Sequence, residues 1–573
     1  MATESFFSNA SLAYLASAGA GKDGKTYSIK PNDGSGDFTF SRGSNLAATR
    51  VGPTGLIEKG RENLLLYSEQ FDNPYYVKSL GTLTENQTTA PDGSLTADLF
   101  TKTSAVNTAS GLNKNSPIYS STGVYTYSVY VKQNVGNDVL LRLDAAGNTA
   151  NAIFQFSTKS ISPTGSNVID ATAIELSDGW FRLSVTGNVT STAWSISIIN
   201  LFANPTNDSV FVWGAQLEVG LAATEVITTG ATTGKAGLLE DEPRFDYSGG
   251  ATCPSLLLEP SRTNLVRQSE YIHGYGVKVG CTTTSNYGTS PEGLVNSTRL
   301  EFTSNGYTYE AIPQVIGTQY TISVYAKRND GGTQSFGFFV DGSGTIDSAM
   351  ALTNEWKRFD YTYTATNAYY FGFAGNSGAD VSVYGFQVEE GSYPTSYIPN
   401  HSGGSVTRGA DSCVVNNTTS SIGQTEGTMF LDFVYDNNGG GFYGSYVANA
   451  NGFTDFVGWR INDNKTTLDI LIRYNNTYQV LDSVLSVFAV GNRYKVALKY
   501  SSGDIKVFVN NQEKYSSTAT YTTPSVPLSK HTISGNNANL VDSLQQDTIS
   551  KVNQSILFPT ALSDADCINI TSL

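Results

Sequence analysis

The chain has 573 residues and a formal net charge of −15, with 15% charged residues, 33 Tyr, 28 Phe and 56 Gly. The excess of acidic side chains argues against binding to nucleic acid or to an anionic membrane surface, because both attract Lys and Arg. The abundance of aromatic residues and Gly, with few stretches of helical period, predicts many short strands joined by tight turns.

Residues 1–60 are predicted to form an N-terminal segment without a core of its own. Two strand-like stretches, 27–31 and 36–42, are separated by Gly and Asp turns and are too short for an independent domain. Residues 1–25 lack the basic and apolar regions of a secretion signal, and no stretch approaches the length of a membrane span. We therefore expect synthesis in a cytoplasm, with segment 1–60 packed on the next module or docked onto another protein.

An internal duplication follows this segment. Residues 61–230 and 262–400 both open with the pattern R-x-N-L-x-x-x-S-E. Four further landmarks recur in the same order: a P-D/E-G turn, an S-V-Y-x-K strand, W-x-R and G-x-Q-x-E. Strand-like alternation within these landmarks predicts two antiparallel, jelly-roll-like β-sandwiches joined by a connector, 231–261.

Residues 401–573 form the last predicted module. A strand is expected at 428–433, and residues 494–500 and 505–509 are expected to pair as a hairpin through the turn at 501–504. Cys413 and Cys567 lie near its two ends. Buried free thiols are favoured for both, because assembly in a cytoplasm keeps thiols reduced.

No metal or other cofactor is predicted. The three histidines lie far apart in the sequence, without the spacing of zinc ligands. Acid–amide loops at 436–441 and 462–464 carry oxygen ligands of the kind that calcium takes, but a role in turns is favoured. The chain also lacks the G-x-S-x-G, H-E-x-x-H, P-loop and dinucleotide-binding motifs, so catalysis is not expected.

At these motifs the chain resembles known families. The two copies resemble the carbohydrate-binding-like β-sandwich modules of structural proteins of tailed phages, through R-x-N-L-x-x-x-S-E, S-V-Y-x-K and G-x-Q-x-E. Residues 33–44 resemble fibre proteins from phages of Bacteroidota hosts, including crAss-like phages. The last module, through residues 494–509 and 557–566, is similar to concanavalin A-like or laminin-G-like lectin sandwiches. Terminal strands are often neighbours in such sandwiches, so this resemblance leaves a disulfide between Cys413 and Cys567 as the alternative to free thiols. The resemblance implies a virion position and attachment to glycans.

Polar pairs in the repeats supply one set of candidate ligand-binding residues. Gln216 and Glu218, like their counterparts Gln387 and Glu389, lie on one face of a strand and could hold a ligand hydroxyl. The favoured alternative is a structural pair whose polar face supports a loop. The repeated Ser-Glu dipeptides at 68–69 and 269–270 are interpreted as fixing a turn.

Aromatic residues supply the other set, because sugar rings stack on Tyr and Trp. Tyr75 and Tyr76 lie in a predicted loop and are the aromatic candidates, with core or surface packing as the favoured alternative. The recurrence of Trp180 as Trp356, and of Trp213 as Tyr384, predicts core packing instead.

The resulting hypothesis is an all-β, non-enzymatic structural protein of a virion surface, a head or tail fibre or spike subunit that adheres to host glycans. Segment 1–60 would bind capsid or tail proteins, and the last module would face the glycans. A homotrimer is expected, because multivalent binding multiplies weak affinities. The alternatives are a decoration protein without a ligand, a virion-associated glycan depolymerase and a cellular adhesin.

Overall fold

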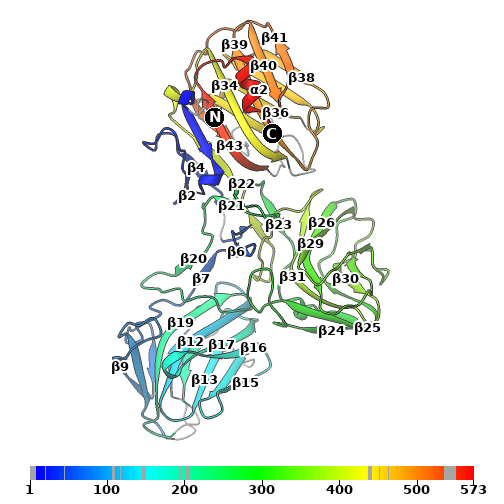
Figure 1. Cartoon of the computed structure of the whole chain (residues 1–573). Helices are drawn as coiled ribbons and strands as arrows, with labels where there is room; N and C mark the ends of the chain where they lie inside the picture. Colours follow the sequence, from blue (N-terminus) through cyan, green and yellow to red (C-terminus); the bar gives the residue numbers. More distant parts are fainter. Residues whose placement is uncertain are drawn as a thin grey trace.

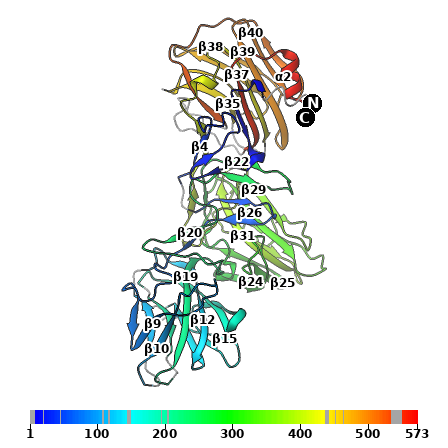
Figure 2. The same cartoon turned by 60° about the vertical axis from the view of Figure 1, so that its left-hand side comes forward.

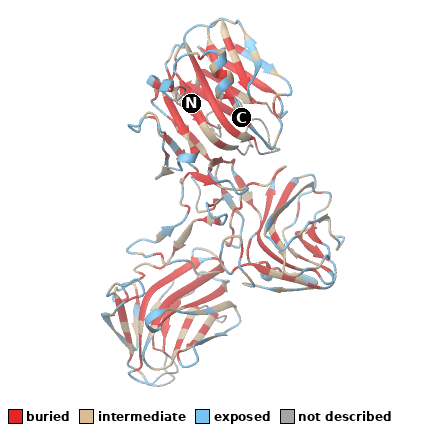
Figure 3. Ribbon diagram, viewed as in Figure 1, coloured by how far each residue is buried: buried red, intermediate tan, exposed pale blue. Residues whose placement is uncertain are grey.

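Three β-sandwiches meet at a junction of short two-stranded ribbons (Figures 1 and 2). The structure is a computed structural model, and it describes residues 8–573 except 20, 44–45, 106–109, 116–117, 144–149, 194, 202–204, 436–441, 451, 463 and 534–549. The described strands pair antiparallel, and buried residues fill the inside of each sandwich (Figure 3). The predicted fold class is confirmed.

The first sandwich consists of two six-stranded sheets that enclose one apolar core. The predicted strand at S-V-Y-x-K lies at the centre of the first sheet, and the motif G-x-Q-x-E ends its neighbour. In order across each sheet, the strands are β16 (Val168–Glu175), β17 (Trp180–Val189), β12 (Gly123–Val135), β19 (Ser209–Val219), β10 (Ala97–Lys102) and β9 (Gly81–Thr88); then β15 (Ser160–Thr164), β14 (Ala150–Gln155), β13 (Asp138–Leu143), β18 (Ile196–Asn200), β11 (Gly111–Lys114) and β8 (Val77–Ser79). The short 3-10 helix η2 (Ser177–Gly179) precedes β17.

The second sandwich repeats this arrangement with shorter connections. Its strands are β28 (Ser348–Ala349), β27 (Phe336–Phe339), β30 (Phe371–Gly375), β25 (Thr298–Glu310), β31 (Asp380–Glu390), β26 (Gln319–Arg328) and β29 (Lys357–Thr364), with β24 (Val277–Thr284) paired to β25 and the 3-10 helix η3 (Ile272–Gly274) before it. The first part of β25 pairs with β31 and its last five residues pair with β30. One continuous strand thus passes between the two layers, where the first sandwich uses the separate strands β10 and β11.

The third sandwich is composite, because strands from three distant parts of the chain complete it. One sheet contains β21 (Arg244–Asp246), β22 (Ser255–Leu258), β43 (Ser550–Phe558), β34 (Glu426–Tyr435), β39 (Asn492–Ser501), β40 (Asp504–Val509) and β41 (Gln512–Ser517), with β1 (Leu12–Leu15) on β43. The other contains β2 (Gly21–Lys22), β3 (Lys25–Thr26), β4 (Phe38–Ser41), β33 (Ser412–Val415), β42 (Leu528–Ile533), β35 (Phe442–Asn449), β36 (Gly452–Ile461), β37 (Leu468–Tyr474) and β38 (Thr477–Val484). Helix α2 (Asp564–Ile570) and the 3-10 helices η1 (Ala16–Ala18) and η4 (Thr419–Ser421) complete the module.

This composite sandwich corrects the expected organisation of segments 1–60 and 231–261. Leu12 pairs with Leu557, Phe40 pairs with Cys413, and Leu256 pairs with Val552. Neither segment is therefore a separate arm or a simple connector. Each is too short to bury its own apolar face, so it adds strands to a sheet that already has a core.

Three two-stranded ribbons lie where the sandwiches meet: β5 (Thr49–Val51) with β6 (Ile57–Lys59), β7 (Arg61–Asn63) with β20 (Gly234–Ala236), and β23 (Arg262–Asn264) with β32 (Val406–Arg408). The strands β7 and β23 contain the R-x-N of the repeated motif, and each pairs with the chain that leaves its own sandwich.

Two local predictions for the last module have clear outcomes. The hairpin is confirmed as β39 and β40, in which Tyr500 pairs with Ile505. Cys413 and Cys567 are buried free thiols that belong to different apolar clusters, so no disulfide joins them. Within the described residues, no helix has the length and apolarity needed to cross a membrane.

Candidate functional site

The repeated motif G-x-Q-x-E forms a bulged strand. Its Gln and Glu side chains, here called the latch, bind the chain that follows the strand. Gly214 and Gly385 have φ of +62° and +65°, and each lies at a shift in the register of its strand. This conformation suits Gly because a Cβ atom would be strained there. After the bulge, Gln and Glu point to the same side of the strand, away from the core.

The Gln and Glu side chains hold the strap, the extended segment that follows each closing strand. In the first sandwich, Gln216 Nε2 donates to Glu218 Oε2 over 2.6 Å, and the backbone N–H of Ile227 donates to Gln216 Oε1 over 2.7 Å. The backbone N–H of Thr224 donates to Glu218 over 2.9 Å. Both side chains are buried.

The second sandwich repeats this geometry at Gln387 and Glu389. Gln387 Nε2 donates to Glu389 over 2.7 Å, and the N–H of Ile398 donates to Gln387 over 2.6 Å. The N–H of Thr395 donates to Glu389 over 3.0 Å. All four candidate residues are thus engaged inside the protein, as the structural alternative predicts. A ligand would have to displace the strap to reach them.

The Asn of R-x-N-L fastens the same strap from its other side. Asn63 donates to Ile227 O over 2.9 Å and accepts from the N–H of Leu217 over 3.0 Å. Asn264 makes the equivalent bonds to Ile398 O and the N–H of Val388. The motif is therefore a device that closes each sandwich.

The aromatic candidates of the first sandwich lie at its core boundary. Tyr76 is buried, and its hydroxyl donates to Leu66 O over 2.8 Å. Tyr75 is half-buried, packs edge-on against Tyr76 and lies under the ammonium of Lys114, which is 4.6 Å from its ring centroid. Burial raises the pKa of both phenols. Only Tyr75 offers part of its ring to solvent. Trp180 and Trp213 are buried, in a small apolar cluster apart from the main core, and Tyr384 is buried as well. Trp356 is only partly buried, so the prediction of core packing is wrong for this residue.

A larger aromatic group covers the outer side of one sheet of the second sandwich. Core-facing Phe371 and Phe373 alternate with Gly along β30, which leaves room on the opposite side for rings from β25 and β27. The group, here called the tyrosine face, comprises Tyr307, Tyr309, Phe339, Tyr369 and Tyr370. Phe339 is buried and the four Tyr are half-buried, so part of each phenol reaches solvent.

The rings of the tyrosine face pack against one another, in two stacked pairs and one edge-on contact. Tyr307 and Phe339 have centroids 5.0 Å apart with planes inclined by 12°, and Tyr309 and Tyr370 have centroids 4.9 Å apart with planes inclined by 19°. Tyr369 packs edge-on against Phe339 at 5.5 Å. Burial and the neighbouring phenols raise the pKa of Tyr369, so its hydroxyl stays a hydrogen-bond donor through the neutral range.

A polar loop, residues 341–347, borders the tyrosine face. A Cβ atom at Gly342 would come within 2.7 Å of the Tyr369 ring, and one at Gly344 within 3.3 Å of the Tyr307 ring. The loop thus approaches the rings closely because Gly occupies these two positions. Asp341 and Ser343 are exposed beside them. Flat aromatic surface bordered by hydroxyl and carboxylate groups is the composition that binds a sugar ring and its hydroxyls.

The corresponding sheet of the first sandwich carries no such group among its described residues. Its outward positions on β11, β13 and β14 include Asn113, Asp138, Arg142 and Asn151, which are partly exposed and polar. The two copies therefore share their closing device but differ on this face. Sequence reasoning missed the tyrosine face because Tyr307 and Tyr309 are brought to Tyr369 and Tyr370 only by the pairing of β25 with β30.

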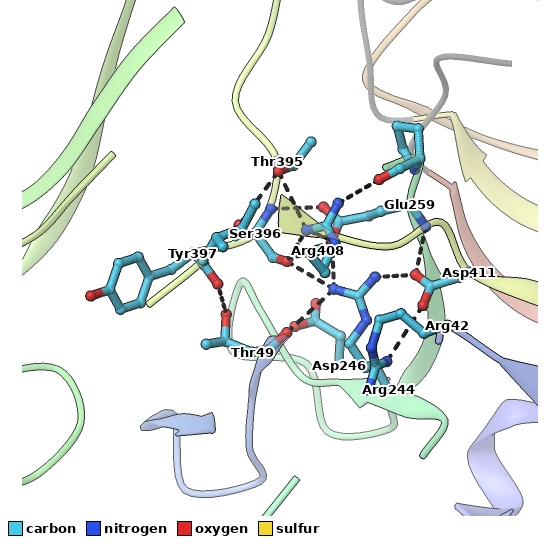
Figure 4. A network of polar contacts seen from close by, with 12 residues as sticks. Arg42, Thr49, Arg244, Asp246, Glu259, Thr395, Ser396, Tyr397, Arg408 and Asp411 are labelled. Carbon is cyan, nitrogen blue, oxygen red and sulfur yellow. Dashed lines mark hydrogen bonds and ion pairs between the residues drawn. The ribbon is translucent and has the colours of Figure 1, made fainter. Parts of the chain in front are cut away.

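At the junction, a buried network of charges joins the second and third sandwiches to the segments that run between them (Figure 4). Arg244 Nη1 lies 2.5 Å from Glu259 Oε2, and Arg244 also pairs with Asp411. Arg408 lies 2.7 Å from Glu259, and Arg42 lies 3.4 Å from Asp411. Every one of these side chains is at most 1% exposed. Burial lowers the pKa of Arg42 to about 10, which still leaves its guanidinium protonated at neutral pH.

A cavity of about 430 Å³ adjoins this network. Its lining includes Arg50, Asp246, Tyr325, Arg358 and Lys551, which come from the N-terminal segment, the connector and two sandwiches. Its walls are therefore fixed by the same contacts that hold the modules. Among the described residues, no group of three or more His, Cys, Asp or Glu is placed to hold a metal. The loop 436–441 and Asp463 lie outside the described residues.

No protein-family model and no curated protein matches this chain. Similar solved structures include the CBM40 of the Ruminococcus gnavus IT-sialidase bound to α2,3-sialyllactose, at 13% identity over 27% of this chain and 87% of that chain, with a TM-score of 0.24. The tandem CBM22 domains of Paenibacillus barcinonensis Xyn10C match at 9% identity over 61% and 100%, with a TM-score of 0.23. The galectin LEC-6 of Caenorhabditis elegans matches at 14% identity over 24% and 85%, with a TM-score of 0.18. Likenesses this weak carry no functional argument.

Proposed function

We propose that this chain is a non-enzymatic adhesion protein that binds glycans through the tyrosine face of its second sandwich. The observation that carries this proposal is the group of four half-buried Tyr around Phe339, bordered by the polar loop 341–347. Ring stacking on Tyr and hydrogen bonds to hydroxyl groups are complementary to a neutral or weakly charged saccharide.

We further propose that the protein works at a virion surface as a fibre or spike subunit, in which several copies act together. This location is supported by the resemblance of residues 33–44 and of the repeated landmarks to phage fibre proteins. Assembly into a homotrimer would multiply a weak affinity for each saccharide. A rigid particle-borne protein also needs fixed angles between modules, and the buried charge network between the second and third sandwiches suits this need.

A glycan array screened with the purified full chain tests the binding proposal. Binding that is retained by Tyr75→Ala and lost by Tyr307→Ala together with Tyr309→Ala is the expected result. A complete array without a single ligand would favour a decoration protein without a ligand. Shortening of an offered polysaccharide would show a depolymerase. Electron microscopy of particles with and without the protein tests its location.

A further inference from the structure

The second sandwich carries an acidic socket that another part of the chain fills. Its acids are Glu270, from the repeated Ser-Glu, and Glu292, from the repeated turn. Lys59 Nζ lies 2.6 Å from Glu270 Oε1 and 3.1 Å from Glu292 Oε2, and Arg61 pairs with Glu292. The lysine side chain is only 4% exposed. The filling segment is residues 56–61, which span β6 and the first residue of β7 and lie outside the core of the second sandwich.

The β6 segment also makes apolar and backbone contacts with the socket. The N–H of Ile57 donates to Pro291 O over 2.9 Å, and Ile57 packs on Tyr384 and Tyr397. Leu56 lies against Gly293, where a Cβ atom would meet it at 3.0 Å. An extended segment with Leu-Ile-x-Lys is therefore bound by a P-E-G turn, two Tyr and two carboxylates.

The first sandwich has acids at the equivalent positions, Glu69 and Asp92, in a more open setting. Glu69 is half-buried, and Asp92 is exposed and accepts from the N–H and the hydroxyl of Ser94. The equivalence follows from the repeated pattern and from the turns, since Gly93 donates to Ala90 O as Gly293 donates to Ser290 O. A Cβ atom added at Gly93, however, would meet no other atom within 4 Å, in contrast to the Leu56 contact at Gly293. Among the described residues, no side chain thus covers this turn in the way that Leu56 covers the turn at Gly293.

The carboxylate of Glu69 also lacks the donors that surround Glu270. Glu270 accepts from the hydroxyls of Tyr384 and Tyr397 at 3.1 and 3.0 Å. In the first sandwich, Trp213 and Val226 occupy the positions that correspond to Tyr384 and Tyr397, as the matching hydrogen bonds of Gln216 and Gln387 show. Val226 has no hydroxyl, and the indole N–H of Trp213 donates to Thr96 instead. Within the described part of the chain, Glu69 Oε1 is buried without a hydrogen-bond partner. An unpaired buried acceptor costs free energy, so a hydrogen-bond donor from a bound partner would stabilise this site.

We propose that the first sandwich binds, at Glu69 and Asp92, an extended basic segment of another protein in the way that the second sandwich binds residues 56–61. The partner segment presents an aliphatic residue two positions before a lysine. The chain's own segment is already engaged with Glu270, so a further copy of this chain cannot supply it without giving up that contact. The surface thus suits a neighbouring protein in an assembly, and this inference is independent of glycan binding.

The test uses a fluorescent peptide with the sequence of residues 53–61 as the probe and the intact chain as the receptor. We expect saturable binding that weakens with salt, falls at least tenfold in the Glu69→Gln, Asp92→Asn variant, and falls equally when the peptide lysine is replaced by Ala. A charge-matched control, Asp72→Asn with Glu85→Gln, changes two exposed acids of the same sandwich and should leave binding unchanged.

Three outcomes would overturn the proposal. They are no binding to the intact chain, equal binding to both double variants, and a purified chain that is oligomeric but becomes monomeric on Glu69→Gln. The last result would make the occupant a second copy exchanging its own segment. Unchanged far-ultraviolet circular dichroism of each variant shows that the fold is retained.

Discussion

Nζ of Lys59 lies 2.6 Å from Oε1 of Glu270, at the junction beside the second sandwich, although the two residues are 211 positions apart in the sequence. Burial lowers the pKa of Lys59 to about 8. Burial alone would raise the pKa of Glu270, but Lys59 and His401 outweigh it and hold that pKa well below its usual value. The pair ties the N-terminal segment to the second sandwich, as the Arg244 network ties it to the third.

Replacing Lys59 by Met should therefore loosen the β5–β6 ribbon. The change leaves two buried carboxylates without their ammonium group, which costs about 3–5 kcal/mol. Hydrogen exchange of the β6 amides in the intact chain measures this loss. Lys235→Met, which removes a half-exposed pair with Glu240, is the control and should change little. Equal exchange in both variants would contradict the role of the buried pair.

Replacing Gln387 by Leu should release the strap of the second sandwich. The variant leaves the N–H of Ile398 unpaired in a buried site and removes one of the two donors to Glu389 Oε2, which keeps the N–H of Thr395. We expect this to cost about 1–3 kcal/mol. Limited proteolysis within residues 391–400 reports the release. Gln216→Leu should do the same at residues 220–230, whereas Gln70→Leu, at an exposed position, should not. Resistance equal to that of the unaltered chain would show that the latch is dispensable.

The repeated landmarks predicted the two sandwiches because the motifs carry their own local geometry: a bulge, a latch and a turn. The composite third sandwich could not be predicted in this way. The strand that contains Leu12 has four residues, and nothing in its sequence specifies a partner at Leu557. Likewise, alternation placed Gln216 and Glu218 on one side of a strand correctly. It could not show that the strap would cover that side.

Replacing Gly385 by Ala should destabilise the second sandwich through backbone strain and a close contact. Its φ of +65° disfavours a side chain, and a Cβ atom would meet the Tyr397 ring at 3.2 Å. We expect a loss of about 1–2 kcal/mol, measured by hydrogen exchange of β31. Gly331→Ala adds the same methyl group where no atom lies within 4 Å and should be neutral. A neutral Gly385→Ala would mean that the bulge tolerates a side chain.

Replacing Tyr307 and Tyr309 together by Ala should weaken the binding of any glycan found by the array at least tenfold, or ~1.4 kcal/mol. The physical reason is the loss of stacking surface next to Phe339. Titration calorimetry with the array ligand measures the effect. Tyr287→Ala removes a phenol that is 44% exposed and packs with Arg299 elsewhere on the same sandwich. If that control loses as much affinity as the double variant, the saccharide does not bind at the tyrosine face.

The third sandwich should lose stability as the pH falls through the range of a buried histidine. His531 is fully buried, its Nδ1 lies 3.1 Å from Tyr446 O, and its Nε2 lies 2.9 Å from Ser555 Oγ. The carbonyl can only accept, so Nδ1 carries the proton and Nε2 accepts from the Ser555 hydroxyl. Burial lowers the pKa of His531 from 6.5 to about 4. Between these values the unfolded chain binds a proton that the folded chain excludes.

The contribution of His531 to the free energy of unfolding is therefore fully present above pH 6.5, and about 3 kcal/mol of it is lost as the pH drops to 4. Urea titrations at several pH values, followed by hydrogen exchange of β42, measure this slope. His531→Gln removes the titrating group and should flatten it, at some cost in stability at neutral pH. His273→Gln, at an exposed position, should leave it unchanged. A slope that persists in His531→Gln would assign the acid sensitivity to the carboxylates instead, because they too lose stabilising charge when protonated.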